Sequence, residues 1–458
     1  MAQTNPLRSL PSVDQVLALL PLDLRNGDHA MAVEVVRAVL AAVRTELRAG
    51  GVGLSHGDIA ARAEASLRRE SLPSLRTVIN ASGVILQTNL GRAPLSERAI
   101  AAVQEAARDY TNLEFDLDAG ARGSRHEHVR DLIRRTTSAE DGIVVNNNAA
   151  ALLMVLQAFA QGREVVVSRG QAVEIGGGFR IPDVLRQSGA RLVEVGTTNR
   201  TYVSDYTSVV TAETAAFLRV HASNFRVVGF TAEAPPAELA AAAHAAGVLL
   251  FDDLGSGCLV DTRRFGMAPE PTVQASLSAG SDLVLFSGDK LIGGPQCGII
   301  AGSTALVGQL RRHPLARALR VDKLTVAALN ATLRSYAEGR EADEIPVWQM
   351  ASRGLPGLKR RAQRWAAEAE TAGSVIAGKT MVGGGSLPGE GVATWLAAVN
   401  AGSGATMLAA ALRAGSPAVV PRIEHDRVIL DPRTVDPRHD ATVTAALRRA
   451  LTDSKYGE

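Results

Sequence analysis

One lysine stands out in the segment SDLVLFSGDKLIGGPQCGIIAG, residues 281–302, where it lies between two apolar runs that indicate strands. The chain has 44 arginines and only five lysines, yet position 290 is a lysine. Desolvation at the end of a buried strand lowers the pKa of a lysine and makes its neutral, nucleophilic amine accessible. Arginine cannot replace lysine in such chemistry. Lys290 is therefore a candidate covalent anchor, and a solvated surface lysine is the alternative interpretation.

Polar side chains also follow two other predicted strands. The segment LLFDDLGSG places Asp252 and Asp253 directly after an apolar run. Neighbouring strand residues point to opposite faces, so at most one of these acids can serve a given ligand. The segment VVNNNAAALL places Asn146, Asn147 and Asn148 before a predicted helix, whose first N–H groups attract anions such as phosphate. Simple helix capping remains the alternative for both segments.

These three strand ends match the needs of one cofactor. Ligands of parallel α/β sheets bind beyond the carboxyl ends of the strands. Pyridoxal phosphate needs an anion site for its phosphate, an acid beside its ring nitrogen and a lysine for the covalent bond. The helix start, the Asp pair and Lys290 supply one of each, so the sequence predicts a pyridoxal phosphate site.

Isolated arginines could hold a second, phosphate-bearing ligand. Arg317 and Arg320 in HPLARALRVDK have the i, i+3 spacing that puts both on one helix face, where two guanidinium groups could clamp a phosphate. Arg92 in TNLGRAPLS is a third candidate in a turn. Glu174 and Arg180 flank a triple glycine that would allow close backbone approach. Surface solvation is the default for each of these side chains.

The elements that must position these groups change in character along the chain. Residues 1–75 indicate three helices, and their eight arginines balance eight acidic residues. From residue 76 to 338, short β-branched strands alternate with helices, which predicts a mostly parallel, doubly wound sheet. Residues 339–458 indicate a small α+β domain with a hairpin around His425-Asp426.

Bulk composition excludes several classes of protein. With 458 residues, 46% hydrophobic and 21% charged, the chain is typical of a globular protein with more than one domain. A net charge of +2 gives no global attraction to nucleic acid or membrane. Two cysteines, no CxxC pair, no secretory signal and no long apolar run predict no disulfide framework, no metal site and no membrane span. We expect a cytoplasmic protein.

Several motifs together resemble a known family. They are INASGVILQTNLGRAPLS, NNNAAALL, SRGQAVEIGGGFRIPDV, FDDLGSG, FSGDKLIGGPQCGII and HPLARALRVDKLTVAALNATLRSY. In combination they resemble bacterial selenocysteine synthase, the L-seryl-tRNA(Sec) selenium transferase family. The likeness extends over nearly the whole chain, to RIEHDRVILDPRTV near the C-terminus. FSGDKLIGGPQ is the most specific of these blocks.

This resemblance implies a fold and a set of site residues. It implies the fold-type-I pyridoxal phosphate architecture, α/β with a mostly parallel central sheet, a helical N-terminal module that recognises tRNA and a small C-terminal domain. Lys290 would form the internal aldimine, and Asp253 rather than Asp252 would face the pyridine nitrogen. Asp289 would be an active-site acid beside the lysine. The cofactor phosphate would be held by Asn147, Asn148, Ala149 and Ser287. The phosphate of the selenium donor would be held by Arg92, Arg317 and Arg320.

The resemblance also implies a reaction and an assembly. Seryl-tRNA(Sec) would become selenocysteinyl-tRNA(Sec) through a cofactor-bound aminoacrylate, with selenophosphate as the selenium donor and Lys290 as the base for the Cα proton. The assembly would be a homo-oligomer built from dimers, such as a decamer. A related lyase or transferase acting on a free amino acid is the first alternative, and it has less use for residues 1–75. A non-catalytic RNA-binding or assembly protein that kept the fold is the second, and it would show no aldimine absorbance near neutral pH.

Overall fold

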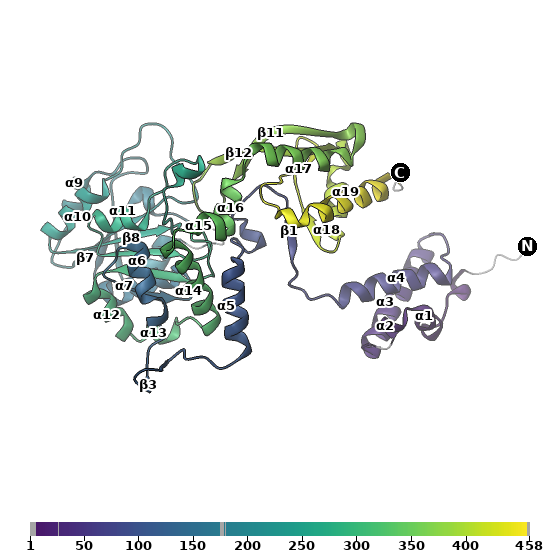
Figure 1. Ribbon diagram of the computed structural model, residues 1–458, viewed down its shortest axis with the longest axis horizontal. Helices are drawn as coiled ribbons and strands as arrows, with labels where there is room; N and C mark the ends of the chain where they lie inside the picture. The colour runs from purple at the N-terminus through teal and green to yellow at the C-terminus, as the bar shows by residue number, and fades with distance from the viewer. Residues whose placement is uncertain (1–5, 26, 175–177, 179, 456–458) are drawn as a thin grey trace, which may run out of the picture. The chain divides into compact units, whose positions relative to one another are not determined.

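The computed structural model describes residues 6–25, 27–174, 178 and 180–455. Its contacts divide the chain into two compact units, Met1–Thr77 and Val78–Glu458 (Figure 1). The predicted boundary between residues 338 and 339 remains a prediction. No helix in the described part of the chain is long and apolar enough to cross a membrane.

The first unit is a small helical bundle. Its α-helices are α1 (Val13–Leu19), α2 (Leu22–Arg25), α3 (His29–Arg48) and α4 (His56–Glu70). Ser12 and Ser55 close capping boxes at the starts of α1 and α4, which satisfies backbone N–H groups that a helix start leaves free. Val36, Leu40 and Ile59 are buried between α3 and α4. The three expected helices are present, and α2 is an additional short one.

The second unit is built on a seven-stranded sheet. Its order is β4-β10-β9-β8-β7-β5-β6. The strands are β4 (Asp141–Val145), β5 (Glu164–Ser168), β6 (Arg191–Val195), β7 (Thr214–Val220), β8 (Leu249–Gly255), β9 (Leu283–Ser287) and β10 (Gly298–Gly302). Only β10 runs antiparallel to its neighbours β4 and β9, and the other pairs are parallel. The prediction of a mostly parallel sheet is confirmed.

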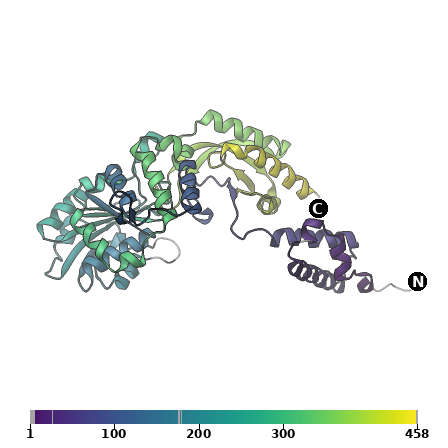
Figure 2. The same cartoon turned by 60° about the horizontal axis from the view of Figure 1, so that its bottom comes forward.

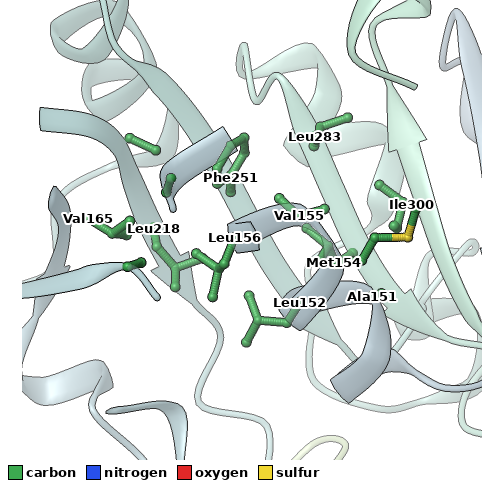
Figure 3. Packing of buried hydrophobic residues seen from close by; sticks show 14 of the residues in the cluster. Ala151, Leu152, Met154, Val155, Leu156, Val165, Leu218, Phe251, Leu283 and Ile300 are labelled. Atoms are coloured by element: carbon green, nitrogen blue, oxygen red, sulfur yellow. The ribbon is translucent and has the colours of Figure 1, made fainter. Parts of the chain in front are cut away.

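Helices cover both faces of this sheet (Figures 1 and 2). The helices up to residue 337 are α5 (Glu97–Arg108), α6 (Glu127–Thr137), α7 (Asn148–Ala160), α8 (Ile181–Ser188), α9 (Val203–Thr207), α10 (Pro236–Ala245), α11 (Val273–Ser278), α12 (Thr304–Arg312), α13 (Leu315–Ala318) and α14 (Lys323–Ala337). Figure 3 shows α7 packed on one face through Leu152 and Leu156, near Leu218 and Phe251. Both faces are apolar, which is why the strands are nearly continuous hydrophobic runs.

A smaller antiparallel sheet follows in the chain. Its order is β11-β12-β15-β14. The elements of this segment are α15 (Glu341–Glu344), α16 (Pro346–Ser352), α17 (Leu355–Ala367), β11 (Gly373–Met381), β12 (Gly391–Asn400), α18 (Ala405–Ala414), β13 (Ala418–Val420), β14 (Arg422–Glu424), β15 (Arg427–Leu430) and α19 (Asp440–Lys455). The predicted hairpin is present, with His425 and Asp426 at φ 49° and 58° between β14 and β15.

Two further pairings join the start of the second unit to segments that are distant in sequence. Strand β1 (Val78–Asn80) pairs in parallel with β13, and Val84 forms a bridge with Met381. The first residues of the second unit therefore pack with its last third. Strands β2 (Phe115–Asp116) and β3 (Ala121–Arg122) form a separate short hairpin.

Candidate active site

A cavity of about 510 Å³ lies at the carboxyl ends of β4, β8 and β9. Of the ten residues to which the family resemblance assigns a role, it gathers eight and leaves out Arg317 and Arg320. Its lining consists of Thr88, Gly91, Arg92, Asn147, Asn148, Ala149, Asp253, Gly255, Ser287, Asp289, Lys290, Gln296 and Cys297. We call it the lysine cavity.

Lys290 lies in the turn after β9 and is only 5% exposed. Burial lowers the pKa of its ammonium group, and the nearby Arg92 lowers it further. Gly255 at the end of β8 has φ +62°, a conformation that favours glycine, and a Cβ at this position would lie 3.6 Å from the lysine Nζ. The glycine therefore leaves space beside the lysine amine. Burial of this amine favours its neutral form.

Asp253 and Asp252 point to opposite faces of β8. Asp253 is 3% exposed, lines the lysine cavity and accepts a hydrogen bond of 2.7 Å from Asn148 Nδ2. Burial raises the pKa of Asp253 to about 6, against the lowering effects of Asn148 and Lys290. Asp252 is 0% exposed, and both its oxygens accept from Arg219 Nη1, at 3.0 and 2.9 Å. Only Asp253 is available to a ligand in the lysine cavity.

The start of α7 forms one wall of the cavity. Asn147 caps the helix by accepting a hydrogen bond from the Ala150 N–H at 2.9 Å. Asn148 Oδ1 is buried without a hydrogen-bond partner in the described part of the chain. The N–H groups of a helix start carry partial positive charge. This wall can therefore hold an anion while Asn148 orients Asp253.

Arg92 and Asp289 form an ion pair inside the cavity. Arg92 Nη1 lies 2.7 Å from Asp289 Oδ2. Arg92 has φ 63°, a left-handed conformation that costs a residue with a Cβ about 1–3 kcal/mol. Such strain is typical of functional sites, because surrounding contacts must maintain it. The pair leaves a guanidinium group at the cavity with its orientation fixed by a buried carboxylate.

The prediction that Arg317 and Arg320 share a helix face is wrong. Helix α13 ends at Ala318, and Arg320 forms a β-bridge with Val145 instead. The helix stops because the Asn146 N–H donates to the Leu319 carbonyl, which holds this segment beside the end of β4. Both arginines are exposed, and Arg320 Nη1 lies 3.5 Å from Glu114 Oε1.

The glycine-flanking pair also lies outside the lysine cavity. Arg180 Nε donates to Glu174 Oε2 at 2.7 Å, and both side chains are exposed. Gly178 has φ +82°, whereas Gly176 and Gly177 lie outside the described residues.

Two parts of the site were missed in the sequence. A Cβ at Gly385 would lie 3.3 Å from Lys290 Nζ and 3.6 Å from Ser223 Oγ, so Gly385 borders the lysine and Ser223 borders the same space. Gly385 belongs to MVGGGSLPG, residues 381–389, whose three consecutive glycines all have positive φ. The glycine run was a usable signal of close backbone approach. Ser223 gave no comparable signal, because a lone serine after a strand is common.

Comparisons with known proteins agree with this geometry. The family model described as L-seryl-tRNA selenium transferase matches residues 78–436. The L-seryl-tRNA(Sec) selenium transferase of Geobacter sulfurreducens is 46% identical over 452 residues, covering 96% of this chain and 98% of that protein. The Moorella thermoacetica protein of the same name is 45% identical over 470 residues, covering 100% and 99%.

A solved structure shares the fold. The structure of D-glucosaminate-6-phosphate ammonia-lyase matches with a TM-score of 0.59 at 23% identity, over 83% of this chain and 97% of that one. At this identity the likeness concerns the fold alone. The expected fold-type-I class, α/β with a mostly parallel central sheet, is confirmed.

Proposed function

This chain belongs to the L-seryl-tRNA selenium transferase family, and from that premise we propose that it converts seryl-tRNA(Sec) to selenocysteinyl-tRNA(Sec) with selenophosphate as the selenium donor. The observation that carries the proposal is the buried Lys290, which shares one cavity with Asp253 and the Arg92–Asp289 pair. A lysine amine and an acid support amino-acid chemistry, and a fixed guanidinium supports binding of a phosphate.

The residues present fit pyridoxal phosphate as the cofactor. The side-chain hydrogen bond to the Asp253 carboxylate comes from the neutral Asn148. A buried carboxylate of raised pKa is stabilised by a cationic partner such as a protonated ring nitrogen. We assign covalent attachment to Lys290, and phosphate binding to Asn147, Asn148, Ala149 and Ser287. When bound, the cofactor supplies an electron sink for the carbanion formed at Cα of the substrate.

Each side chain of the lysine cavity then has a separate role in the reaction. The lowered pKa of Lys290 makes a neutral amine available to take the Cα proton. Asp253 keeps a proton on the ring nitrogen, and Asn148 keeps Asp253 in place. Asp289 orients Arg92 toward the phosphate of the selenium donor. The net change at Cβ of the serine replaces the hydroxyl group by selenium: the carbon–oxygen bond breaks, a carbon–selenium bond forms, and the selenium–phosphorus bond of the donor breaks with release of phosphate.

The proposed partners involve surfaces outside the lysine cavity. Arg317 and Arg320 do not line it, so their contact with selenophosphate requires a second subunit or a rearrangement. The proposed assembly is a homo-oligomer built from dimers, such as a decamer, in which a neighbouring subunit could bring these arginines to the donor. The helical unit at residues 1–75 is assigned to the body of the tRNA, which proteins recognise largely by shape and backbone contacts. The proposed location is the cytoplasm.

The test uses the purified full-length protein with seryl-tRNA(Sec) and selenophosphate. We expect selenocysteinyl-tRNA(Sec), and Lys290→Ala should lower its rate of formation by a factor on the order of 10⁴ and remove the cofactor absorbance. Free serine is the control substrate. Turnover of a free amino acid without turnover of the seryl-tRNA would replace this proposal with the lyase or transferase alternative. Absence of any cofactor absorbance in the wild type would favour the non-catalytic alternative.

A further inference from the structure

A second cavity, of about 240 Å³, lies near the ends of β5, β6 and β7. His221 follows β7 and Glu270 precedes α11, and both side chains line this cavity. Hydroxyl and amide side chains of Gln171, Thr197 and Asn199 form another part of its lining. We call it the His221 cavity.

The His221 cavity adjoins the lysine cavity at two places. His221 lines the first, whereas Ser223, two residues later, borders the same space beside Gly255 and Gly385 as Lys290 does. Likewise Leu387 lines the His221 cavity, whereas Gly385 lies against Lys290. Two short segments of chain therefore separate the cavities. Burial is the main cause of the lowered pKa of Lys290, and Glu270 is one of the anions near enough to oppose it.

Glu270 and His221 place two polar atoms close together in the lining of the His221 cavity. The side chain of Glu270 is only 3% exposed, and its Oε1 lies 3.3 Å from His221 Nε2. Neither atom makes a hydrogen bond within the described part of the chain. The two atoms are an ion pair only when the imidazole is protonated, and a buried carboxylate oxygen without a hydrogen bond is costly, so the pair is suited to a ligand that brings a hydroxyl group.

The charge of the lining limits the ligand class. Three arginines line the cavity, and each has contacts of its own: Arg219 pairs with the buried Asp252, Arg226 pairs with Glu390, and Arg200 donates to the Phe230 carbonyl. Glu233 and Glu270 add two carboxylates. Because each arginine already has a partner, a ligand would meet mainly the carboxylate, hydroxyl and amide groups of the lining, which suit a partner with hydroxyl groups. The lining thus favours a neutral, hydroxyl-rich group such as a nucleoside.

We propose that the His221 cavity binds the terminal nucleoside of the aminoacylated RNA, with Glu270 accepting a hydrogen bond from the ribose hydroxyl beside the ester. This inference rests on the proposed function. In seryl-tRNA only the Cα, the carbonyl carbon and the ester oxygen separate the serine amine from the ribose. When that amine reaches Lys290, the ribose must lie in a space directly adjoining the lysine cavity. A 2′-hydroxyl is also the group by which proteins distinguish RNA.

The experiment compares two substrates on the full-length protein with its cofactor. One is seryl-tRNA(Sec), and the other carries serine on the 3′-oxygen of a terminal nucleoside that lacks the 2′-hydroxyl. For the wild type we expect the deoxy substrate to lower kcat/KM about ten- to a hundredfold, the range for a hydrogen bond to a charged group. Glu270→Gln should show a similar loss with the normal substrate and no further loss with the deoxy substrate.

The controls separate this proposal from the function on which it depends. Glu238→Gln makes the same change at an exposed position on α10 and should respond to the two substrates as the wild type does. Equal kcat/KM of the wild type for both substrates would overturn the proposal. The proposal would also be overturned if Glu270→Gln kept the wild-type ratio of kcat/KM between the two substrates. A shifted cofactor absorbance in that variant would overturn it too, because the Glu270–His221 pair would then act on the cofactor. Equilibrium binding of both RNAs to the wild type is measured alongside. Equal Kd values for the two RNAs would contradict nucleoside binding in the His221 cavity, whereas absence of turnover would contradict the proposed function.

Discussion

The two faces of strand β8 carry one aspartate each, and the two aspartates have different kinds of partner. Asp252 lies on the face where Arg219 and Ser276 donate hydrogen bonds to it, so its charge is fully compensated inside the protein. Asp253 lies on the other face, where the neutral Asn148 is its side-chain donor and Lys290 is the nearby amine. One face uses a carboxylate for stability, and the other holds a carboxylate ready for a ligand.

Removing the compensated carboxylate should have the largest effect on folding. Asp252→Ala leaves the guanidinium group of Arg219 buried without its partner, and breaking a buried ion pair costs about 3–5 kcal/mol. We expect the free energy of unfolding, measured by denaturant titration, to fall by that amount. Asp261→Ala, which breaks an exposed pair with Arg263, is the control and should change little. Equal destabilisation by the two variants would remove the distinction between the faces of β8.

Replacing the other carboxylate should affect turnover instead. Asp253→Asn keeps the size of the side chain and removes the negative charge proposed to face the cofactor ring. We expect kcat to fall on the order of 10²–10³-fold, as for the loss of one electrostatic contact to a reacting group. The free energy of unfolding should hold or rise, because a buried charge is removed. A variant with normal kcat would show that Asp253 does not contact the ring.

The smallest expected effect is the pH dependence of the free energy of unfolding, measured on the protein without its cofactor. The folded protein binds a proton at Asp253 with a pKa of about 6, whereas an unfolded chain binds it near the ordinary value of about 3.9. The folded state therefore holds the extra proton between these values, and its stability falls as the pH rises from about 4 to about 6. Asp253 contributes about 3 kcal/mol to this fall. The free energies of unfolding of the wild type and Asp253→Asn should converge at low pH. A constant difference between the two free energies at every pH would contradict the raised pKa.

Much of the lysine cavity could be predicted because of one rule of α/β sheets. The carboxyl ends of parallel strands meet at one edge, so Asn147, Asp253 and Lys290 come together although they are far apart in sequence. Alternation along β8 predicts that only one aspartate faces the cavity. The choice between the two could not be made from spacing, since it depends on Arg219 from a neighbouring strand.

Other parts of the site depend on contacts that local patterns do not encode. The spacing of Arg317 and Arg320 fits a helix, but the backbone pairing of Leu319 with Asn146 ends that helix early. Gly385 reaches Lys290 from the loop between β11 and β12, and tertiary packing brings that loop to the end of β9. Glu270 lies in a loop segment between η4 (Thr262–Phe265) and α11, with no motif to mark it.

The pairing of β1 with β13 has a consequence for synthesis of the protein. Strand β1 begins at Val78, but its partner begins at Ala418, so the ribosome must make most of the chain before β1 can pair. Until then Ile79, which is buried in the finished protein, has no complete core to enter. Such pairing between distant segments slows folding and prolongs exposure of apolar surface. Nascent chains that stop before Ala418 should therefore keep the start of the second unit open to chaperones and proteases.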